Sequence, residues 1–455
     1  MIQKIKLKRG LDIAINGKAA EVIGSNPQGE VFSVVPDHFA GITPKVVVKE
    51  GEHVEAGSPV FYNKQCSEMQ FVSPVSGEVV AVNRGERRKV LSIDIRADKE
   101  QVYKTFEKIN LADASADELK QTLLQAGLWW CVKQRPYDVI ANPAIAPKKV
   151  FVSTFDTAPL APNYEFIAQG RAQHLQAAIT AFSIISGKDV EVGLRAGSTA
   201  NDFRMLQHAH FTEFEGAHPA GNVGVQIHHV DAVNKGEVVW TINLQDMLII
   251  GKFLCEGIVD MTKLVALTGP EVYEPQYYRV KYGSTASNIL RGSIHKEVAL
   301  RLVGGNALSG QQINEDEVLS PYTNQITVLE EGADTHELFG WIMPRFNKFS
   351  NSNTFLTKIL RKVCPKMTFE FDARILGGQR AIIMSGEYEK VLPMDIYVEY
   401  LIKAMIAGNI DKMEALGAYE IAPEDLALCE FVCTSKLPLQ AIVRKALDNM
   451  KSELE

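Results

Sequence analysis

Glycine residues divide the first hundred residues of the chain into short apolar runs. They stand at Gly10, Gly17, Gly24, Gly29, Gly41, Gly51, Gly57, Gly77 and Gly85. Glycine adopts the positive φ angles that tight turns need, so short strands joined by glycine turns are expected. Residues 1–105 are therefore predicted to form an all-β domain.

Two glycine-centred pieces of this region look alike. Residues 44–60 and 71–85 each read as a strand, a glycine turn and a second strand. Together they resemble the two halves of a biotinyl/lipoyl-like barrel-sandwich domain. Carrier domains of that kind present a modified lysine at a hairpin tip, in Met-Lys-Met for biotin. The link over residues 63–70 lacks that triplet, so Lys64 is interpreted as an ordinary surface lysine.

The pattern changes to alternating strands and helices after residue 105. The predicted elements are a helix with a capping box at Ser115–Glu118 and a stop at Gly127, strands at 149–153 and 190–194, and helices at 175–185 and 202–208. Such alternation indicates an α/β layer. We predict a Rossmann-like α/β domain over residues 106–256.

Two further domains are predicted in the second half of the chain. Strands at 264–267 and 277–282 with a short helix at 287–290 suggest a small β-grasp domain over residues 257–330. Helices at 395–407 and 439–454 indicate a helical domain over residues 331–455. The predicted fold class is therefore α+β and α/β, multidomain.

Composition excludes several classes of protein. The 455 residues carry a net charge of −7, which argues against a nucleic-acid binder. No apolar run approaches the ~20 residues that cross a bilayer, and the first residues do not resemble a signal peptide. The six cysteines are scattered, which is typical of a chain in a reducing compartment.

Gly127 is followed by an unusual aromatic stretch, Leu128 to Tyr137, with adjacent Trp129 and Trp130. Both indoles could belong to the core, with their N–H groups satisfied locally. They could also form an apolar slot with Arg135 as its polar group, suited to a flat hydrophobic ligand. The sequence leaves both interpretations open.

The candidate metal and cluster motifs are weak. Five histidines lie between residues 208 and 229, namely His208, His210, His218, His228 and His229. His228 and His229 are expected on a strand, where they would face opposite ways, so no metal site is predicted. Cys429 and Cys433 are only two thiols, fewer than an iron–sulfur cluster needs. No glycine-rich nucleotide motif and no catalytic residue is predicted.

Many short stretches, in one order, resemble a known family. They are 8–12, 71–77 with 83–85, 126–129, 135–136, 156–161, 218–221, 338–341 with 343–344, and 424–429. The order of modules is similar to that of the flavin subunit of complex I and the C subunit of the Rnf complex. The chain resembles more closely, along nearly its whole length, the NqrA family, which comprises the A subunits of the sodium-translocating NADH:quinone reductases.

The resemblance implies a subunit that has lost its redox groups. Where relatives hold a glycine-rich flavin loop, this chain has Gly127-Leu-Trp129-Trp130, and the four-cysteine motif is reduced to Cys429 and Cys433. No cofactor is expected on this chain, and quinone is the expected substrate. FMN, FAD or riboflavin and iron–sulfur centres are expected on partner subunits. The membrane-embedded B subunit of the complex is the expected main partner, at the cytoplasmic face of the bacterial inner membrane.

Two other functions remain open. One is an FMN-binding electron-transfer subunit of an Rnf-like complex. The other is a carrier or ligand-binding module outside respiration, which the barrel-sandwich and β-grasp domains suggest.

Two segments are the candidate quinone contacts implied by the resemblance. Each joins aromatic or apolar surface to a hydrogen-bond donor, His38 in one and Arg135 in the other. The candidate residues are His38, Phe39, Gly41, Trp129, Trp130, Arg135 and Tyr137.

A basic, aromatic-rich segment is the candidate docking surface. Residues 343–366 contain no Asp or Glu, although the chain as a whole is acidic. The segment is expected to help hold the protein to its membrane partner, or else to form a solvated loop on its own domain. The docking candidates are Arg345, Lys348, Lys358, Arg361 and Lys362.

Overall fold

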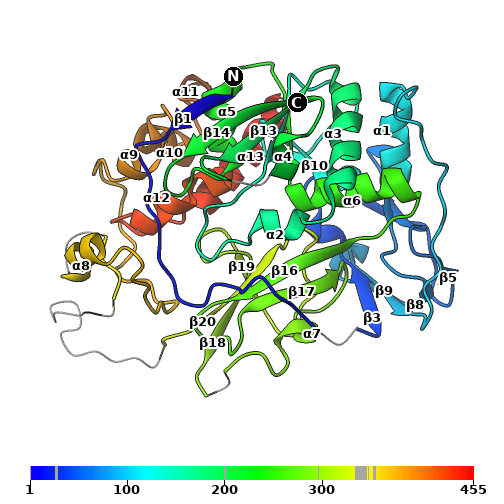
Figure 1. Ribbon diagram of the computed structural model, residues 1–455, viewed down its shortest axis with the longest axis horizontal. Coiled ribbons are helices and arrows are strands. Elements are labelled where there is room, and N and C mark those ends of the chain that lie inside the picture. The colour runs from blue at the N-terminus through cyan, green and yellow to red at the C-terminus, as the bar shows by residue number, and fades with distance from the viewer. Residues whose placement is uncertain are drawn as a thin grey trace.

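The computed structural model describes residues 2–25, 29–198, 201–295, 297–333, 346, 348–351 and 355–454. These residues form four sheets and a group of C-terminal helices, arranged around a central α/β layer (Figure 1). In the described part of the chain, no helix combines the length and the apolarity that a membrane crossing requires.

The barrel-sandwich domain consists of two small antiparallel sheets. One has the order β3 (Val31–Val34), β9 (Val90–Ala97), β8 (Gly77–Arg84) and β5 (His53–Val54), and the other has β4 (Pro44–Val46), β6 (Pro59–Asn63) and β7 (Cys66–Val72). The stacked rings of Phe61 and Phe71, 4.5 Å apart, lie in its core. A Cβ at Gly77 would lie 1.9 Å from the Arg96 carbonyl oxygen, so this close approach of two strands requires glycine. The prediction of short strands between glycine turns is confirmed here.

The strands within residues 2–25 pair with strands outside the two barrel sheets. Strand β1 (Gln3–Lys6) pairs in parallel with β14, and β2 (Ile23–Gly24) pairs in parallel with β17. Ile15 forms a β-bridge with Phe369 in the C-terminal region. We call residues 2–25 the N-terminal strap, because they touch three other parts of the molecule. An alternating pattern predicts a strand but does not identify the sheet that it joins.

The α/β domain contains a seven-stranded sheet. Its order is β1, β14 (Ala209–Glu215), β13 (Val190–Arg195), β12 (Val150–Ser153), β15 (Val239–Ile242), β10 (Val132–Arg135) and β11 (Val139–Ile140). The pairings from β1 to β15 are parallel, and β10 is antiparallel. The helices are α1 (Ala116–Gln125), α2 (Tyr164–Ala168), α3 (Ala172–Ser186), α4 (Asn201–Arg204), α5 (Val223–Asp231) and α6 (Leu244–Glu256).

This sheet separates two hydrophobic cores. Val150 and Val152 of β12 point to the core that contains α3 and α6, whereas Phe151 points to the core shared with the C-terminal helices. The split follows from the alternation of side chains along a strand. Helices α3 and α6 lie side by side in Figure 1. The α/β domain therefore holds the barrel on one side and the helical domain on the other.

The local helix signals are largely confirmed. Ser115 and Glu118 form the predicted capping box of α1, and α3 ends at Gly187 in the left-handed conformation. The helix predicted over residues 202–208 is shorter, because α4 ends at Arg204 and His208 has a φ of 59°.

The third domain is a six-stranded mixed sheet. Its order is β19 (Gln311–Ile313), β18 (Leu300–Gly304), β20 (Gln325–Glu330), β16 (Thr262–Thr268), β17 (Gln276–Lys281) and β2, with α7 (Ser287–Leu290) beside it. The predicted hairpin is present as the antiparallel pair β16–β17.

The C-terminal region is helical, as predicted. Its elements are α8 (Thr357–Val363), α9 (Tyr388–Val391), α10 (Val398–Ile406), α11 (Ile410–Ala415), η4 (Pro423–Leu426), α12 (Ala427–Val432) and α13 (Leu439–Leu454). Helix α13 has the predicted bounds, and α10 starts three residues later than predicted.

Candidate functional site

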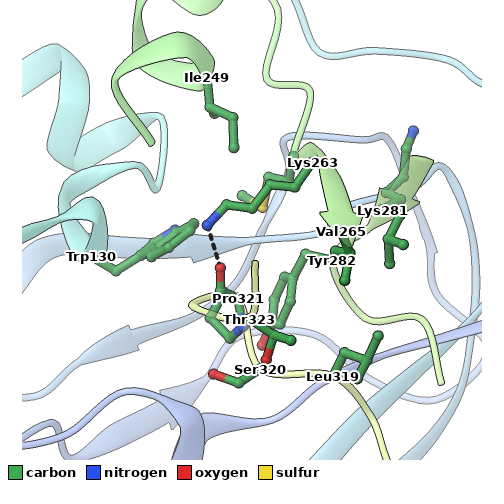
Figure 2. Close-up of a pocket in the computed structure, with 12 residues that line it drawn as sticks. Trp130, Ile249, Lys263, Val265, Lys281, Tyr282, Leu319, Ser320, Pro321 and Thr323 are labelled. Carbon is green, nitrogen blue, oxygen red and sulfur yellow. Dashed lines mark hydrogen bonds between the residues drawn. The ribbon is translucent and has the colours of Figure 1, made fainter. Parts of the chain in front are cut away.

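A pocket lies where the α/β domain meets the third domain, and Figure 2 shows its walls. Its cavity volume is about 20 Å³, which is room for about one water molecule. One wall is Trp130 from the short turn η3 (Trp129–Cys131), and another is formed by β16 and β17 with Tyr282. The residues Leu319 to Pro321, with Thr323, close the side opposite Ile249 of α6. We call it the Trp130 pocket.

Its most unusual side chain is the buried cation Lys263. The ammonium lies 2.6 Å from the Asp246 carboxylate and donates a 2.5 Å hydrogen bond to the Pro321 carbonyl. It also lies 5.6 Å from the centre of the Trp130 ring. Burial raises the pKa of Asp246, and the nearby ammonium opposes that rise. An ammonium has three N–H donors, so these two oxygen partners leave one donor that can face a ligand.

Two tyrosines support the aromatic walls. The Tyr322 hydroxyl donates a 3.1 Å hydrogen bond to the Trp130 carbonyl, and the two rings meet edge to face. The Tyr282 hydroxyl accepts a hydrogen bond from the Val35 amide. Burial raises the pKa of both tyrosines, so both hydroxyls stay protonated at neutral pH.

The structure brings the first predicted segment to this pocket. Phe39, which follows the turn η1 (Pro36–His38), packs 5.9 Å from Trp130 and 6.0 Å from Tyr282. The His38 ring lies 6.3 Å from the Tyr282 ring, and burial lowers the His38 pKa. Gly41 lies farther along in a turn with a φ of 80°, which favours glycine.

The two tryptophans of the second predicted segment belong to one hydrophobic core but have different neighbours. The Trp129 indole donates a 2.7 Å hydrogen bond to the Ala141 carbonyl and packs edge to face against Trp240, so Trp129 is a core residue. Trp130 points the other way, into the pocket wall. Trp129 is therefore structural, whereas Trp130 lines the pocket.

Arg135 and Tyr137 lie away from the Trp130 pocket, against the C-terminal helices. The buried Arg135 guanidinium forms a 2.6 Å ion pair with Asp425, a 3.2 Å pair with Glu424, and a hydrogen bond to the Glu420 carbonyl. The backbone carbonyl of Tyr137 accepts a hydrogen bond from Arg444. In this structure the Arg135 guanidinium is engaged by these partners and not by the pocket. A role for Arg135 in holding quinone stays a prediction.

A second, polar cavity lies at the carboxyl edge of the parallel strands, and we call it the His218 cavity. Its lining includes Asp156, His218, Asn222, Asn306 and Glu424, from three of the domains. Burial lowers the pKa of His218 to about 4 and raises the pKa of Asp156. Three stretches that carried the family resemblance, 156–161, 218–221 and 424–429, therefore meet here.

The histidine and cysteine motifs are embedded in the fold. His228 and His229 lie on helix α5, not on a strand, and His228 pairs with Glu420 at 2.7 Å. Over so short a run, the apolar positions around the two histidines fit both the helical and the strand periodicity. This ambiguity explains why a strand was wrongly expected there. Cys429 and Cys433 are buried at α12, as predicted for structural cysteines. Within the described residues, no group of three or more potential ligands could hold a metal ion.

Three of the docking candidates are engaged by contacts within the molecule. Lys348 pairs with Asp372 at 3.2 Å, Lys358 donates to the Asn351 carbonyl, and Arg361 donates to the Asp12 carbonyl. Lys362 is exposed on α8. Arg345 lies outside the described residues.

Sequence reasoning missed Lys263 and Tyr282. Lys263 immediately precedes the apolar run Leu264–Leu267, and such a lysine would ordinarily reach solvent. The burial of its partner Asp246 inside α6 was the available signal, because a carboxylate among apolar helix residues requires a partner.

The fold and the pocket define a class: a multidomain chain with a barrel-sandwich domain, an α/β domain and a further mixed sheet. Residues 5–98 match the NqrA N-terminal barrel-sandwich hybrid domain. Residues 114–259 match the NqrA second alpha/beta domain, and residues 264–315 match the NQRA C-terminal domain.

Full-length relatives specify the family. The chain is 33% identical over 452 residues to the A subunit of the Na(+)-translocating NADH-quinone reductase of Photorhabdus laumondii, and the match covers 99% of this chain and 100% of that protein. The corresponding A subunit of Alcanivorax borkumensis is 34% identical over 453 residues, with the same coverage. The chain belongs to the NqrA family, the A subunits of the Na(+)-translocating NADH-quinone reductases.

Proposed function

We propose that this chain is a peripheral component of a Na⁺-translocating NADH:quinone reductase that helps to bind quinone and holds no redox group of its own. The observation that carries the proposal is the relationship along the whole chain to proteins with that name. In this proposal, flavins and iron–sulfur centres reside on partner subunits. The chain docks on the membrane-embedded B subunit at the cytoplasmic face and is inactive when isolated.

The strand order also supports the proposed types of the second and third domains. The order β14, β13, β12, β15 with parallel pairing is the order of a doubly wound, Rossmann-like sheet around its switch point. The β16–β17 hairpin with α7 and β18 supports a β-grasp assignment for the third domain.

The quinone headgroup is proposed to occupy the Trp130 pocket. The cavity of about 20 Å³ has room for about one water molecule, so a substituted ring would enter only after the walls formed by Trp130 and Tyr282 move apart. Trp130 and Tyr282 offer aromatic faces for the ring, and the rings of His38 and Phe39 pack against Tyr282.

Lys263 is the proposed polar contact. Its remaining N–H donor can bind one quinone carbonyl, and reduction of quinone increases negative charge on that oxygen. A fixed ammonium in a site that excludes water favours the reduced, more negative form over the oxidised form. Asp246 holds the ammonium in place at 2.6 Å.

A pair of lysine variants tests the proposal. Lys263→Met should weaken binding of a short-chain quinone at least tenfold, because the donor and its charge are lost. Lys281 lines the same pocket, but its ammonium donates to the Tyr103 hydroxyl and points away from the cavity (Figure 2). Lys281→Met should therefore leave the affinity within about twofold.

Quenching of tryptophan fluorescence, supported by calorimetry, measures both affinities. If Lys263→Met lowers stability by leaving Asp246 unpaired, the double variant with Asp246→Asn restores charge balance and is titrated instead. Equal affinity of the parent and the folded Lys263 variants would contradict this site.

A further inference from the structure

Helix α8 presents its apolar stripe outward. Four apolar residues recur at the i, i+3, i+4 and i+7 positions that mark one face of a helix. Their exposed fractions are 50% for Leu356, 62% for Ile359, 37% for Leu360 and 77% for Val363. In a globular domain such a stripe normally faces the core, so this orientation is inverted.

The inverted orientation is fixed by contacts on the opposite face. Arg361 stacks over the Phe349 ring at 5.3 Å and donates to the Asp12 carbonyl. Thr357 is buried and donates a 2.7 Å hydrogen bond to the Lys348 carbonyl. The polar face of α8 therefore packs against the rest of the protein. Its apolar face is exposed.

The loop that follows continues the same apolar character. Ile375 and Leu376 are exposed, as are Ile383 and Met384. In the described part of the chain, 24 large hydrophobic side chains are exposed, and nine of them fall within residues 346–384. This concentration in one short region exceeds the scattered single residues found on ordinary surfaces.

The same region is cationic in an acidic chain. Residues 346–384 contain seven lysines and arginines but only two acids, Glu370 and Asp372, whereas the whole chain has a net charge of −7. Asp372 is neutralised by Lys348 at 3.2 Å and Arg374 at 2.7 Å. Lys362 on α8 and Lys366 just after it are exposed.

We propose that α8 and the loop over residues 373–384 form a surface that binds the headgroup region of an anionic lipid bilayer. An apolar stripe flanked by lysines is the pattern of helices that lie in the membrane interface, where side chains enter the acyl boundary and cations meet lipid phosphates. A helix of seven residues gives a weak and reversible contact, which suits a protein that its partner subunits also hold. The proposal is independent of quinone binding and assigns the contact to exposed residues rather than to Arg361 and Lys358.

Vesicle flotation with the full chain tests this surface. The probes are vesicles of phosphatidylcholine alone and of phosphatidylcholine with about one third phosphatidylglycerol, at low and high salt. The apolar variant is Ile359→Ser with Val363→Ser, and the charge variant is Lys362→Glu with Lys366→Glu. A matched control reverses two exposed lysines of the barrel domain, Lys64→Glu with Lys99→Glu.

The parent and the control should float with the anionic vesicles, less at high salt and little with neutral vesicles. Each α8 variant should reduce the bound fraction at least threefold while its circular dichroism stays that of the parent. Absence of binding by the parent, or equal binding by parent and α8 variants, would overturn the proposal. So would concentration-dependent dimerisation that the apolar variant abolishes without any vesicle binding, since the stripe would then serve a second copy of the chain.

Discussion

The Trp130 pocket and the His218 cavity adjoin the same α/β domain but differ in polarity. The first is aromatic and contains one buried cation, Lys263. The second is lined by amides, carboxylates and an uncharged histidine, and Arg135 binds one of its residues, Glu424. The structure thus places one buried cation at each cavity, each paired with a buried aspartate.

The two cations differ in their surroundings. Lys263 has oxygen partners for two of its three N–H donors and faces an empty volume. Arg135 binds two carboxylates and a carbonyl at the contact between the α/β domain and the C-terminal helices. Burial of a charge therefore does not identify a ligand site by itself. The Arg135 Nε–H is buried without a hydrogen-bond partner, so the distinction is that Lys263 lines the Trp130 pocket whereas Arg135 lies between two domains.

Removal of the Arg135 charge should produce the largest effect on stability. Arg135→Met leaves Asp425 buried without its cation, and loss of one member of a buried ion pair typically costs about 3–5 kcal/mol. Urea unfolding at neutral pH should show this loss, while the quinone affinity of the folded fraction should stay within about twofold.

The double variant Arg135→Met with Asp425→Asn supplies the control, because it removes both charges. It should recover part of the lost stability. A cost below about 1 kcal/mol for the single variant would show that the pair is not what holds the C-terminal helices.

The His218 cavity should make stability dependent on pH. The His218 pKa is about 4 in the folded chain and about 6.5 when unfolded. Between these values only the unfolded chain binds the proton, so this contribution is complete above pH 6.5 and decreases as the pH falls toward 4. His218 should account for about 2 kcal/mol of the loss between pH 7.5 and pH 5.

Urea unfolding of the parent and of His218→Gln at both pH values isolates this contribution. The variant should lose less stability on acidification, because glutamine does not titrate. The same loss in both proteins would place the pH dependence elsewhere.

The smallest effect is expected at the rim of the Trp130 pocket. Tyr322→Phe removes the 3.1 Å hydrogen bond to the Trp130 carbonyl, which should cost about 1 kcal/mol. Tyr397→Phe, at an exposed hydroxyl, is the control and should change stability by less than about 0.5 kcal/mol. Equal urea midpoints for the two variants would show that Tyr322 does not hold the Trp130 turn.

Structural features that depend on residues close together in the chain could be predicted from the sequence. The capping box at Ser115, the stop at Gly187 and the hairpin of β16 and β17 all follow from neighbouring residues. The family resemblance further supplied the order of the domains, and His38, Phe39 and Trp130, which it named as candidates, lie at or beside one pocket.

Features that depend on distant partners could not be predicted in this way. The pairing of Arg135 with Asp425 joins positions 290 residues apart, and Lys263 reaches Pro321 over 58 residues. A single sequence shows that each residue is charged but not which element lies opposite. For the same reason the pairing of β1 with β14 and of β2 with β17 could not be predicted.

The N-terminal strap has a consequence for the order of events during synthesis. Residues 3–6 pair with residues 212–215, so at about 5–20 residues per second the ribosome needs roughly 10–40 s to supply that partner. The barrel strands, from residue 31 to residue 97, are complete much sooner. Strand β1 must therefore wait as an unpaired edge, and its alternate lysines, Lys4 and Lys6, give it the charge that discourages pairing with other nascent chains.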